Sequence, residues 1–390
     1  MNNFTYQLPT KIIFGRGTEN TVGSEVANYS KKILLHFGGK SAEKSGLLGR
    51  VRASLQIAGI EWIELGGVQP NPVLSLVRKG IERCRRDNVG FVLAVGGGSV
   101  IDSSKAIAAG VFYEGDVWDF YSGDAAPPTK ALPVGAILTI PASGSESSPG
   151  SVITKEEGAL KRAVNADCLY PRFSILNPEL AFTLPADQIA NGVADIMAHL
   201  MERYFTNTPH VEFGDRLIEA ALRTVIASAP LLFRGTHDYD AWAEVMWAGD
   251  MAHNNLLDRG RVGDWGSHGI ERELSGIYDV AHGAGLAVIF PAWMKYVYRH
   301  DVARFAQFAA RVWGVEPDYL DVERTAIEGI ARLEAFWKSI GLPLRLSELG
   351  IGTNRIDELA LRCTENGSKK IGHLVELDTA DIAAIYRAAE

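Results

Sequence analysis

The segment at residues 91–102 reads Phe91-Val92-Leu93-Ala94-Val95-Gly96-Gly97-Gly98-Ser99-Val100-Ile101-Asp102. Its first five residues form a continuous apolar run, which is typical of a strand covered on both faces of a parallel sheet. Three glycines then interrupt the run, and the residues after them can open a helix. A strand, a tight loop and a helix in this order indicate a βαβ unit, and therefore an open, doubly wound α/β sheet.

The rest of the first half repeats this alternation. Short apolar runs predict further strands at 33–37, 62–65 and 134–140, and helical spacing recurs at 47–55 and 72–87. Beyond about Pro185 the strand pattern fades and helical periodicity takes over, at 186–206, 210–234, 240–257, 265–277, 301–313, 320–340, 354–364 and 379–389. We therefore predict two domains, an α/β domain with a parallel sheet at 1–182 and an all-helical domain at 183–390.

The composition excludes several classes of protein. Of the 390 residues, 47% are hydrophobic and 22% are charged, so wholesale disorder is excluded. The formal net charge of −8 argues against a nucleic acid or an anionic membrane as the main partner. We see no apolar stretch long enough to span a bilayer and no signal-peptide pattern. Cys84, Cys168 and Cys363 lie far apart, which is typical of a reducing compartment, so we expect a cytoplasmic enzyme.

The glycine loop at 96–98 is a candidate phosphate cradle. Glycines let the backbone approach an anion closely, and a helix N-terminus offers N–H groups and the positive end of its dipole to a pyrophosphate. The alternative is a plain tight turn in which Ser99 only caps the helix and Asp102 completes the cap. The spacing is not Gly-x-Gly-x-x-Gly, so the standard Rossmann fingerprint is absent.

Two further loops leave predicted strands. The polar loop at 139–146 lies where open α/β sheets bind ligands, although an ordinary Ser/Gly loop has the same composition. The turn at 36–41 lacks the acidic residue that bonds the ribose hydroxyl of NAD. Because its Gly, Lys and Ser residues would tolerate or bind an added phosphate, we predict NADP as the nucleotide, with NAD as the alternative.

One carboxylate and three histidines form a candidate metal site. Asp195 and His199 lie four residues apart in a helical stretch, so both project from one face. His268 lies on a predicted helix, and His282 at a loop or helix start. Such ligands suit zinc or iron, and a catalytic metal also keeps an open position for a substrate oxygen. The spacing alone equally fits a surface Asp–His pair and scattered histidines that bind no metal.

Motifs along essentially the whole chain resemble, in the same order, those of the group III metal-dependent, or iron-containing, alcohol dehydrogenases. Within that family they resemble the NADP-preferring branch of butanol dehydrogenases and aldehyde reductases. The motifs lie at Phe14-Gly15, 69–72, 96–102, 139–146, 195–199, 264–268 and 277–285. The resemblance implies a dehydroquinate synthase-like fold, with an N-terminal dinucleotide-binding domain and a helical domain that binds metal and substrate. It also implies a homodimer formed through the N-terminal strand edge.

The resemblance further implies the site residues. The metal ligands would be Asp195, His199, His268 and His282, holding Fe²⁺ or Zn²⁺. The implied nucleotide contacts are Gly38, Ser41, Asn71, Gly97, Gly98, Ser99, Asp102, Thr139, Ser143 and Lys161. For Lys161 the alternative is a solvated charge in a surface hairpin. The implied reaction transfers a hydride between nicotinamide C4 and a primary alcohol or an aldehyde such as butanal.

Arg272 departs from the family pattern. The family usually carries a second histidine four residues after the third ligand, where this chain has Arg272, one turn beyond His268. Arginine stays charged and cannot shuttle a proton. We expect Arg272 in the active site and consider three roles for it. It binds a carboxylate-bearing substrate, or it presses on the nicotinamide and weakens catalysis, or it swings out to pair with Glu271 or Glu273. The alternative function is therefore a relative with low activity or with an anionic semialdehyde or polyol as substrate.

Overall fold

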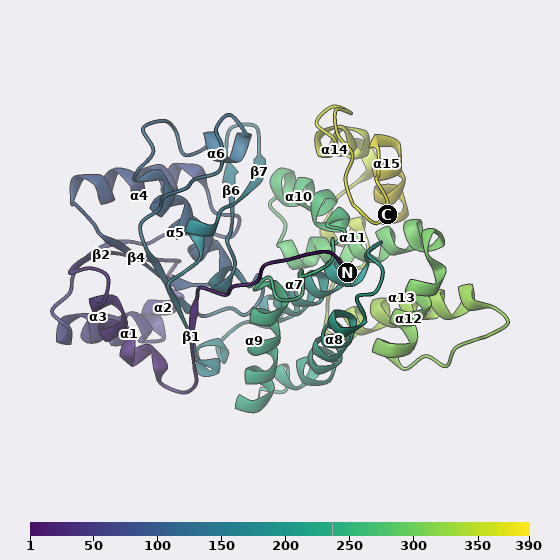
Figure 1. Cartoon of the computed structure of the whole chain (residues 1–390), viewed down its shortest axis with the longest axis horizontal. Coiled ribbons are helices and arrows are strands. Elements are labelled where there is room, and N and C mark those ends of the chain that lie inside the picture. Colours follow the sequence, from purple (N-terminus) through teal and green to yellow (C-terminus); the bar gives the residue numbers. More distant parts are fainter. Residues whose placement is uncertain (236) are drawn as a thin grey trace. The chain divides into compact units, whose positions relative to one another are not determined.

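The computed structural model describes residues 1–235 and 237–390, and the chain divides into two compact units. An α/β unit comprises Gln7–Leu184, and a helical unit comprises Met1–Tyr6 together with Pro185–Glu390. In Figure 1 the α/β unit runs from purple to blue-green and most of the helical unit from green to yellow. The first six residues thus group with the helices and not with the sheet, and the N–H of Asn2 donates to the Gly260 carbonyl at 2.9 Å.

The α/β unit is built on six parallel strands in the order β1-β8-β5-β4-β2-β3. The predicted strands are confirmed as β2 (Lys32–Phe37), β3 (Glu61–Leu65), β4 (Phe91–Gly96) and β5 (Val134–Leu138), the last of which ends two residues earlier than expected. The sequence did not reveal β1 (Lys11–Phe14) or β8 (Phe173–Leu176), because four residues are too few for a clear pattern.

Helices cover both faces of this sheet, as the continuous apolar run of β4 requires. Phe91, Leu93 and Val95 are fully buried in one core with α1 (Val22–Ala27) and α3 (Leu47–Ile57). Val92 is buried in a second core, which contains α4 (Leu74–Arg86) and α5 (Gly98–Gly110). The doubly wound α/β architecture is therefore confirmed. The remaining elements of the unit are α2 (Ser41–Lys44), α6 (Asp119–Ser122) and an antiparallel hairpin of β6 (Gly150–Lys155) and β7 (Leu160–Asn165).

All eight predicted helical stretches of the second unit are helices. They are α7 (Ala186–Tyr204), α8 (Glu212–Leu232), α9 (Tyr239–His253), α10 (Gly266–Tyr278), α12 (Val302–Trp313), α13 (Val322–Ser339), α14 (Ile356–Cys363) and α15 (Thr379–Ala388). A further helix, α11 (His282–Val297), was not predicted. It packs against α7, α10, α13 and α15 and is buried along almost its whole length, so it has no polar face to produce a helical period.

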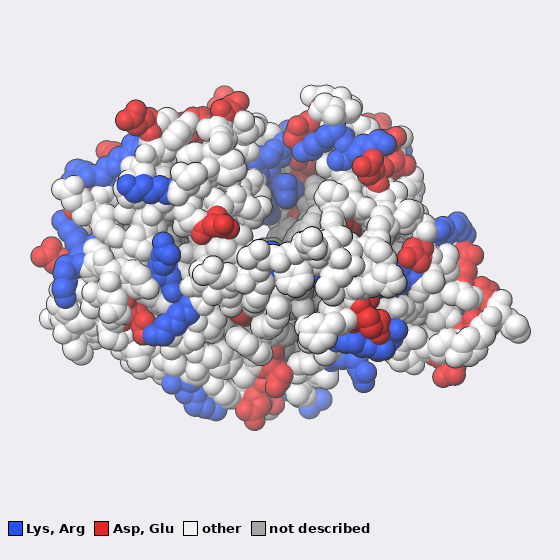
Figure 2. Space-filling model, in the orientation of Figure 1, with Lys and Arg blue, Asp and Glu red and all other residues white. Residues whose placement is uncertain are grey.

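The surface carries charges of both signs. On the face drawn in Figure 2, the Lys and Arg side chains and the Asp and Glu side chains occur in small groups that are interspersed with one another. Among the described residues, no helix is both long enough and apolar enough to cross a membrane.

Candidate functional site

Three loops of the α/β unit lie at the carboxyl ends of the neighbouring strands β2, β4 and β5. Gly38 follows β2, Gly97 follows β4 and Thr139 follows β5. The Thr139 N–H donates to the Gly96 carbonyl at 3.1 Å. The last two loops touch, because a Cβ added to Gly98 would lie 2.2 Å from the Ser143 Oγ. The expected nucleotide contacts in these three loops therefore lie along one edge of the sheet, where open α/β folds bind ligands.

The start of α5 is not capped by a side chain. Gly97 is the N-cap residue, Ser99 lies inside the first turn, and no side-chain cap is found there among the described residues. The alternative in which Ser99 and Asp102 merely cap this helix is therefore wrong. The first N–H groups of α5 have the geometry that favours an anionic ligand.

Asp102 and Lys105 fasten the loop that follows β5. The Asp102 carboxylate accepts from the Ser145 Oγ at 2.5 Å and from the Val152 N–H at 3.0 Å. The Lys105 ammonium, which is fully buried, donates to the carbonyls of Ser145, Ser148 and Gly150 at 2.7 to 2.8 Å and to the Ser145 Oγ at 3.0 Å. Burial lowers the pKa of Lys105 to about 8, against the charges of Asp102 and Glu146. Sequence reasoning missed Lys105, although it lies one turn after Asp102.

The other expected nucleotide contacts occupy different surroundings. Ser41 is exposed at the start of α2, and Asn71 is buried with a positive φ of 53°. Lys161 lies in β7 and is only 7% exposed, so it is not the solvated charge considered as its alternative. Burial raises the pKa of Asp102, and the positive charge of Lys161 acts in the opposite direction.

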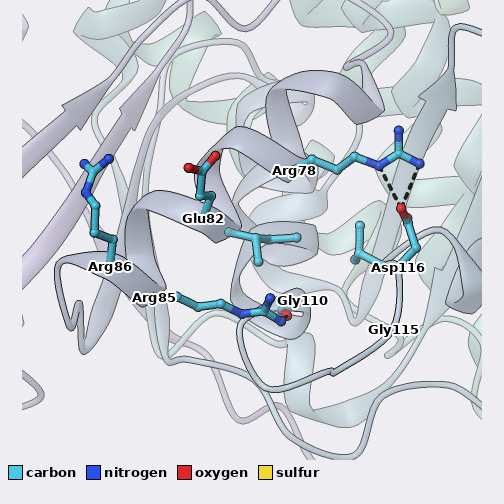
Figure 3. Close-up of a pocket in the computed structure, with 9 residues that line it drawn as sticks. Arg78, Glu82, Arg85, Arg86, Gly110, Gly115 and Asp116 are labelled. Atoms are coloured by element: carbon cyan, nitrogen blue, oxygen red, sulfur yellow. Dashed lines mark hydrogen bonds and ion pairs between the residues drawn. The ribbon is translucent and has the colours of Figure 1, made fainter.

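A surface pocket of about 420 Å³ lies at the opposite end of α5, beside Gly110 (Figure 3). Arginines line it, but they are engaged by the protein. Arg78 pairs with Asp116 at 2.8 Å, and Arg85 donates to the Gly110 carbonyl at 2.7 Å. Arg86 pairs with Asp87 at 2.9 Å. We therefore assign no ligand to this pocket.

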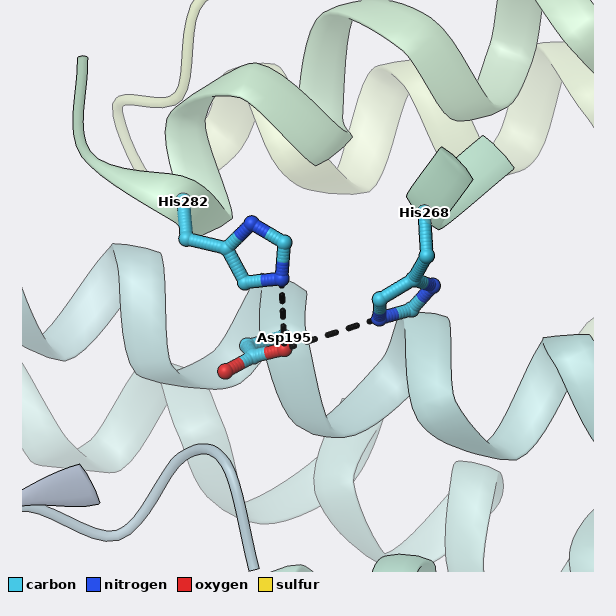
Figure 4. Close-up of side chains that lie close together, drawn as sticks. All are labelled: Asp195, His268 and His282. Carbon is cyan, nitrogen blue, oxygen red and sulfur yellow. Dashed lines mark ion pairs between the residues drawn. The ribbon is translucent and has the colours of Figure 1, made fainter. Parts of the chain in front are cut away.

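The helical unit brings together the predicted metal ligands. Asp195 projects from α7, His268 from the first turn of α10, and His282 is the first residue of α11. Figure 4 shows both imidazoles directed at the same carboxylate. The His268 Nε2 lies 3.9 Å and the His282 Nε2 3.8 Å from the Asp195 Oδ1, and one ligand atom from each of these three residues falls within 4.8 Å of the others.

His199 lies beside this cluster. Its Nδ1 is 3.6 Å from the Asp195 Oδ1, and its ring stacks on that of His268 with centroids 4.8 Å apart. The side chains of His199 and His268 are 7% and 8% exposed, whereas that of His282 is 30% exposed. The cluster is therefore buried on one side and accessible on the His282 side.

The donor atoms suit a metal ion. In the described part of the chain, the buried His199 Nδ1 and His268 Nε2 make no hydrogen bond, which is costly for polar atoms unless a ligand engages them. Burial is also the main cause that lowers the pKa of both histidines well below 6.5, so both imidazoles are neutral, as metal coordination requires. One carboxylate and three imidazoles match the preferences of zinc and iron.

Two buried carboxylates, to which the sequence analysis gave no role at the metal site, support the histidines. Glu202 accepts from the His268 Nδ1 at 2.7 Å, and Glu271 bonds the His282 Nδ1. Burial raises the pKa of Glu202 to about 7, against the hydrogen bonds that it accepts, and a bound dication would act in the same direction as those bonds. Helical spacing could have found Glu202, because it lies seven residues after Asp195 and three after His199 on α7.

Arg272 is partly exposed on α10, and its positive charge is among the causes that lower the pKa of His268. Glu271 and Glu273 are both buried, and Glu273 pairs with Arg362 at 3.0 Å. Neither carboxylate is therefore a surface group, and the partner of Arg272 stays a prediction.

Known families and structures match over the full length of the chain. Residues 9–178 match the family described as Iron-containing alcohol dehydrogenase, and residues 189–390 match the family described as Fe-containing alcohol dehydrogenase family, C-terminal. A probable NADH-dependent butanol dehydrogenase 1 of Bacillus subtilis is 42% identical over 100% of both chains. The NADPH-dependent aldehyde reductase YqhD of Escherichia coli is 34% identical, also over 100% of both. The structure of an NADH-dependent butanol dehydrogenase A from Thermotoga maritima superposes with a TM-score of 0.96 at 40% identity, covering 100% of this chain and 99% of the other.

Proposed function

Because the chain belongs to the iron-containing alcohol dehydrogenase family and is an NAD(P)-dependent alcohol dehydrogenase, we propose that it uses NADP(H) and a divalent metal to interconvert primary alcohols and aldehydes such as butanol and butanal. The observation that carries this proposal is the convergence of the His268 Nε2 and the His282 Nε2 on the Asp195 Oδ1, beside His199. Relatives named as butanol dehydrogenase and aldehyde reductase support the substrate class.

Asp195, His199, His268 and His282 would hold the metal. When bound, Fe²⁺ or Zn²⁺ supplies Lewis acidity that polarises a substrate carbonyl or stabilises an alkoxide. The exposed side of His282 leaves room for a substrate to approach, whereas the buried sides of His199 and His268 exclude water from the rest of the cluster. Because the buried imidazoles of His199 and His268 are neutral, each has one nitrogen with a lone pair that a metal can accept.

The α/β unit would hold the nucleotide, which supplies or accepts the hydride. Gly38, Gly97 and Gly98 keep the loop backbones open, and the uncapped start of α5 would bind the pyrophosphate. The turn at 38–41 favours NADP over NAD, because it is solvent-accessible, carries Lys40 and has no carboxylate to repel a 2′-phosphate. Among the relatives, one name specifies NADH and another NADPH, so the preference is a property to measure on this chain.

Arg272 would tune the substrate range. Its charge reaches His268, and the group is partly exposed, so a carboxylate-bearing aldehyde would gain an ionic contact that a simple aldehyde lacks. Exchange of Arg272→His and comparison of turnover with butanal and with a semialdehyde acid separates the two substrate classes. An unchanged rate with both substrates would remove Arg272 from the site.

The deciding experiment measures NADPH and NADH consumption with butanal, on protein reconstituted separately with Fe²⁺ and with Zn²⁺, beside an Asp195→Ala variant. We expect metal-dependent turnover that is faster with NADPH and is lost in the variant. Turnover that survives chelation and the Asp195→Ala exchange would overturn the metal-dependent function. Equal or faster turnover with NADH would overturn the nucleotide preference and leave the rest of the proposal in place.

A further inference from the structure

Glu202 accepts hydrogen bonds from several groups at the start of α10. Its side chain is fully buried, and its Oε1 accepts from the Ser267 Oγ at 2.6 Å, the His268 N–H at 3.0 Å and the His268 Nδ1 at 2.7 Å. Its Oε2 accepts from the Trp265 N–H at 2.6 Å. One carboxylate of α7 therefore fixes both the backbone and the imidazole of His268.

Glu271 supports the imidazole of His282 at the start of α11 in a similar way. It is fully buried, and its two oxygens bond the Ser275 Oγ and the His282 Nδ1. Its side chain fills a space that a glycine leaves open, since a Cβ at Gly285 would lie 2.5 Å from the Glu271 Oε1. The carboxylate is thus clamped between α10 and α11 and does not depend on solvent for its position.

A carboxylate at this place selects one imidazole tautomer. An ionised carboxylate only accepts hydrogen bonds, so the facing Nδ1 must carry the proton. In the other neutral tautomer the Nδ1 lone pair would face the Glu202 oxygen at 2.7 Å, which is repulsive. With the proton on Nδ1, the Nε2 of each histidine presents its lone pair toward Asp195, where a metal would accept it.

His199 is supported differently. Its Nδ1 faces Asp195, and its ring packs against those of His253 and His268, with centroids 4.3 and 4.8 Å away. Ring packing restricts the plane of an imidazole but does not set its proton. Two of the three histidines therefore receive both orientation and tautomer from a carboxylate, and these two carboxylates add negative charge that favours a dication.

We propose that Glu202 and Glu271 are positioning residues that hold His268 and His282 in the Nδ1–H form and so set the affinity of the cluster for a divalent metal. The proposal rests on the metal-dependent function, but it concerns binding and not turnover. Neither residue contacts the substrate in this proposal.

The test uses the full-length chain and measures the dissociation constants of Zn²⁺ and Co²⁺ by competition with a chelating dye, together with the visible spectrum of the Co²⁺ form. Glu271→Gln can still accept from the His282 Nδ1 and donate to the Ser275 Oγ, so it changes charge with little change in shape. Glu271→Ala removes the contact as well. Glu273→Gln is the matched control, because Glu273 is equally buried on the same helix but pairs with Arg362.

We expect Glu271→Ala to weaken metal binding about 10- to 100-fold and to shift the Co²⁺ spectrum. Glu271→Gln should weaken binding by a smaller factor, and Glu273→Gln should leave it within about 2-fold. Glu202→Gln should also weaken metal binding about 10- to 100-fold, since the NH2 group of its amide would face an N–H donor. Thermal unfolding of the metal-free proteins separates this effect from general destabilisation.

Two outcomes would overturn the proposal. The first is a Glu271→Ala protein that melts normally and binds both metals as tightly as the wild type. The second is an equal loss in the Glu273→Gln control. If the wild-type protein binds neither Zn²⁺ nor Co²⁺, the metal-dependent function itself fails, which is a different result from a metal site that ignores Glu271.

Discussion

Gly283 sets the spacing between the helices that carry His282 and Asp195. It follows His282 in the first turn of α11, and a Cβ placed on it would lie 2.0 Å from the Asn191 carbonyl oxygen and 2.6 Å from the Asn191 Cα. Asn191 lies in α7, one turn before Asp195. Ordinary contacts begin at 3.4 Å, so Gly283→Ala must separate the start of α11 from α7 by about 1.4 Å.

The consequence for metal binding follows from bond lengths. A zinc ion binds nitrogen and oxygen ligands at about 2.0–2.2 Å, so two ligands of one ion lie at most about 4.4 Å apart. The His282 Nε2 and the Asp195 Oδ1 are 3.8 Å apart, which a single ion can bridge. The shift of α11 caused by Gly283→Ala lengthens this separation to about 5 Å, which a single ion cannot bridge. We therefore expect Gly283→Ala to lose at least about 10-fold in metal affinity.

Stability should fall together with metal affinity. Overpacking of this kind costs about 1–3 kcal/mol, which lowers the melting temperature of a unit of this size by about 2–12 °C. The assay combines dye-competition titration with Zn²⁺ and thermal unfolding of the metal-free protein. Gly49→Ala is the control, because a Cβ on this helical glycine of α3 meets nothing within 4 Å and should raise stability slightly. Metal affinity and melting temperature of Gly283→Ala at wild-type values would refute the reasoning.

Three further outcomes are expected in the α/β unit and at the thiols. Lys105→Met should cost about 3–5 kcal/mol in urea unfolding and weaken NADPH binding in a fluorescence titration, because it leaves buried acceptors and a buried carboxylate without the ammonium; unchanged NADPH affinity would separate this residue from the nucleotide loops. Burial lowers the pKa of His36 from 6.5 to about 4, so the unfolded chain binds a proton that the folded chain rejects between these values. The contribution of His36 to stability should therefore fall by up to about 3 kcal/mol as the pH drops from 6.5 to 4. His36→Gln should make the urea-midpoint profile less steep over that range, because the buried His199 and His268 still contribute to it, whereas parallel profiles would contradict the assignment. Ellman's reagent should modify the partly exposed Cys168 first, while the buried Cys84, whose pKa burial raises to about 12, and the buried Cys363 should react only in denaturant; a fast reaction that persists in Cys168→Ser would show that a buried thiol is accessible.

Local sequence patterns predicted the elements that carry a short apolar run or a clear helical periodicity. β4 was predictable because both of its faces are buried, so its five apolar residues needed no alternation. α11 was not, for the same physical reason applied to a helix. Its apolar residues surround the axis and include Pro291, so neither a period of 3.6 residues nor an uninterrupted helix-forming composition marked it. The short strands β1 and β8 join the sheet by pairing with other strands, and four residues are too few to predict that pairing from the sequence.

The candidate site shows the same division between local and tertiary information. The spacing of Asp195 and His199 placed both on one face of α7, and helix geometry alone was enough for that. His268 and His282 approach them only because α10 and α11 pack against each other and α11 against α7, which no spacing along the chain records. Their residue types made these two histidines candidates, and the family resemblance is what favoured a metal site over scattered histidines.

Buried charged residues were the most difficult to foresee. Glu202 and Lys105 belong to residue types that usually remain solvated, so a sequence pattern assigns them to the surface. Each is buried because another segment brings complementary groups to it: the start of α10 brings four donors to Glu202, and the loop after β5 brings four acceptors to Lys105. A buried charge without such partners would cost several kcal/mol. The positions of these two residues therefore depend on the same packing that forms the candidate metal site and the candidate nucleotide-binding loops.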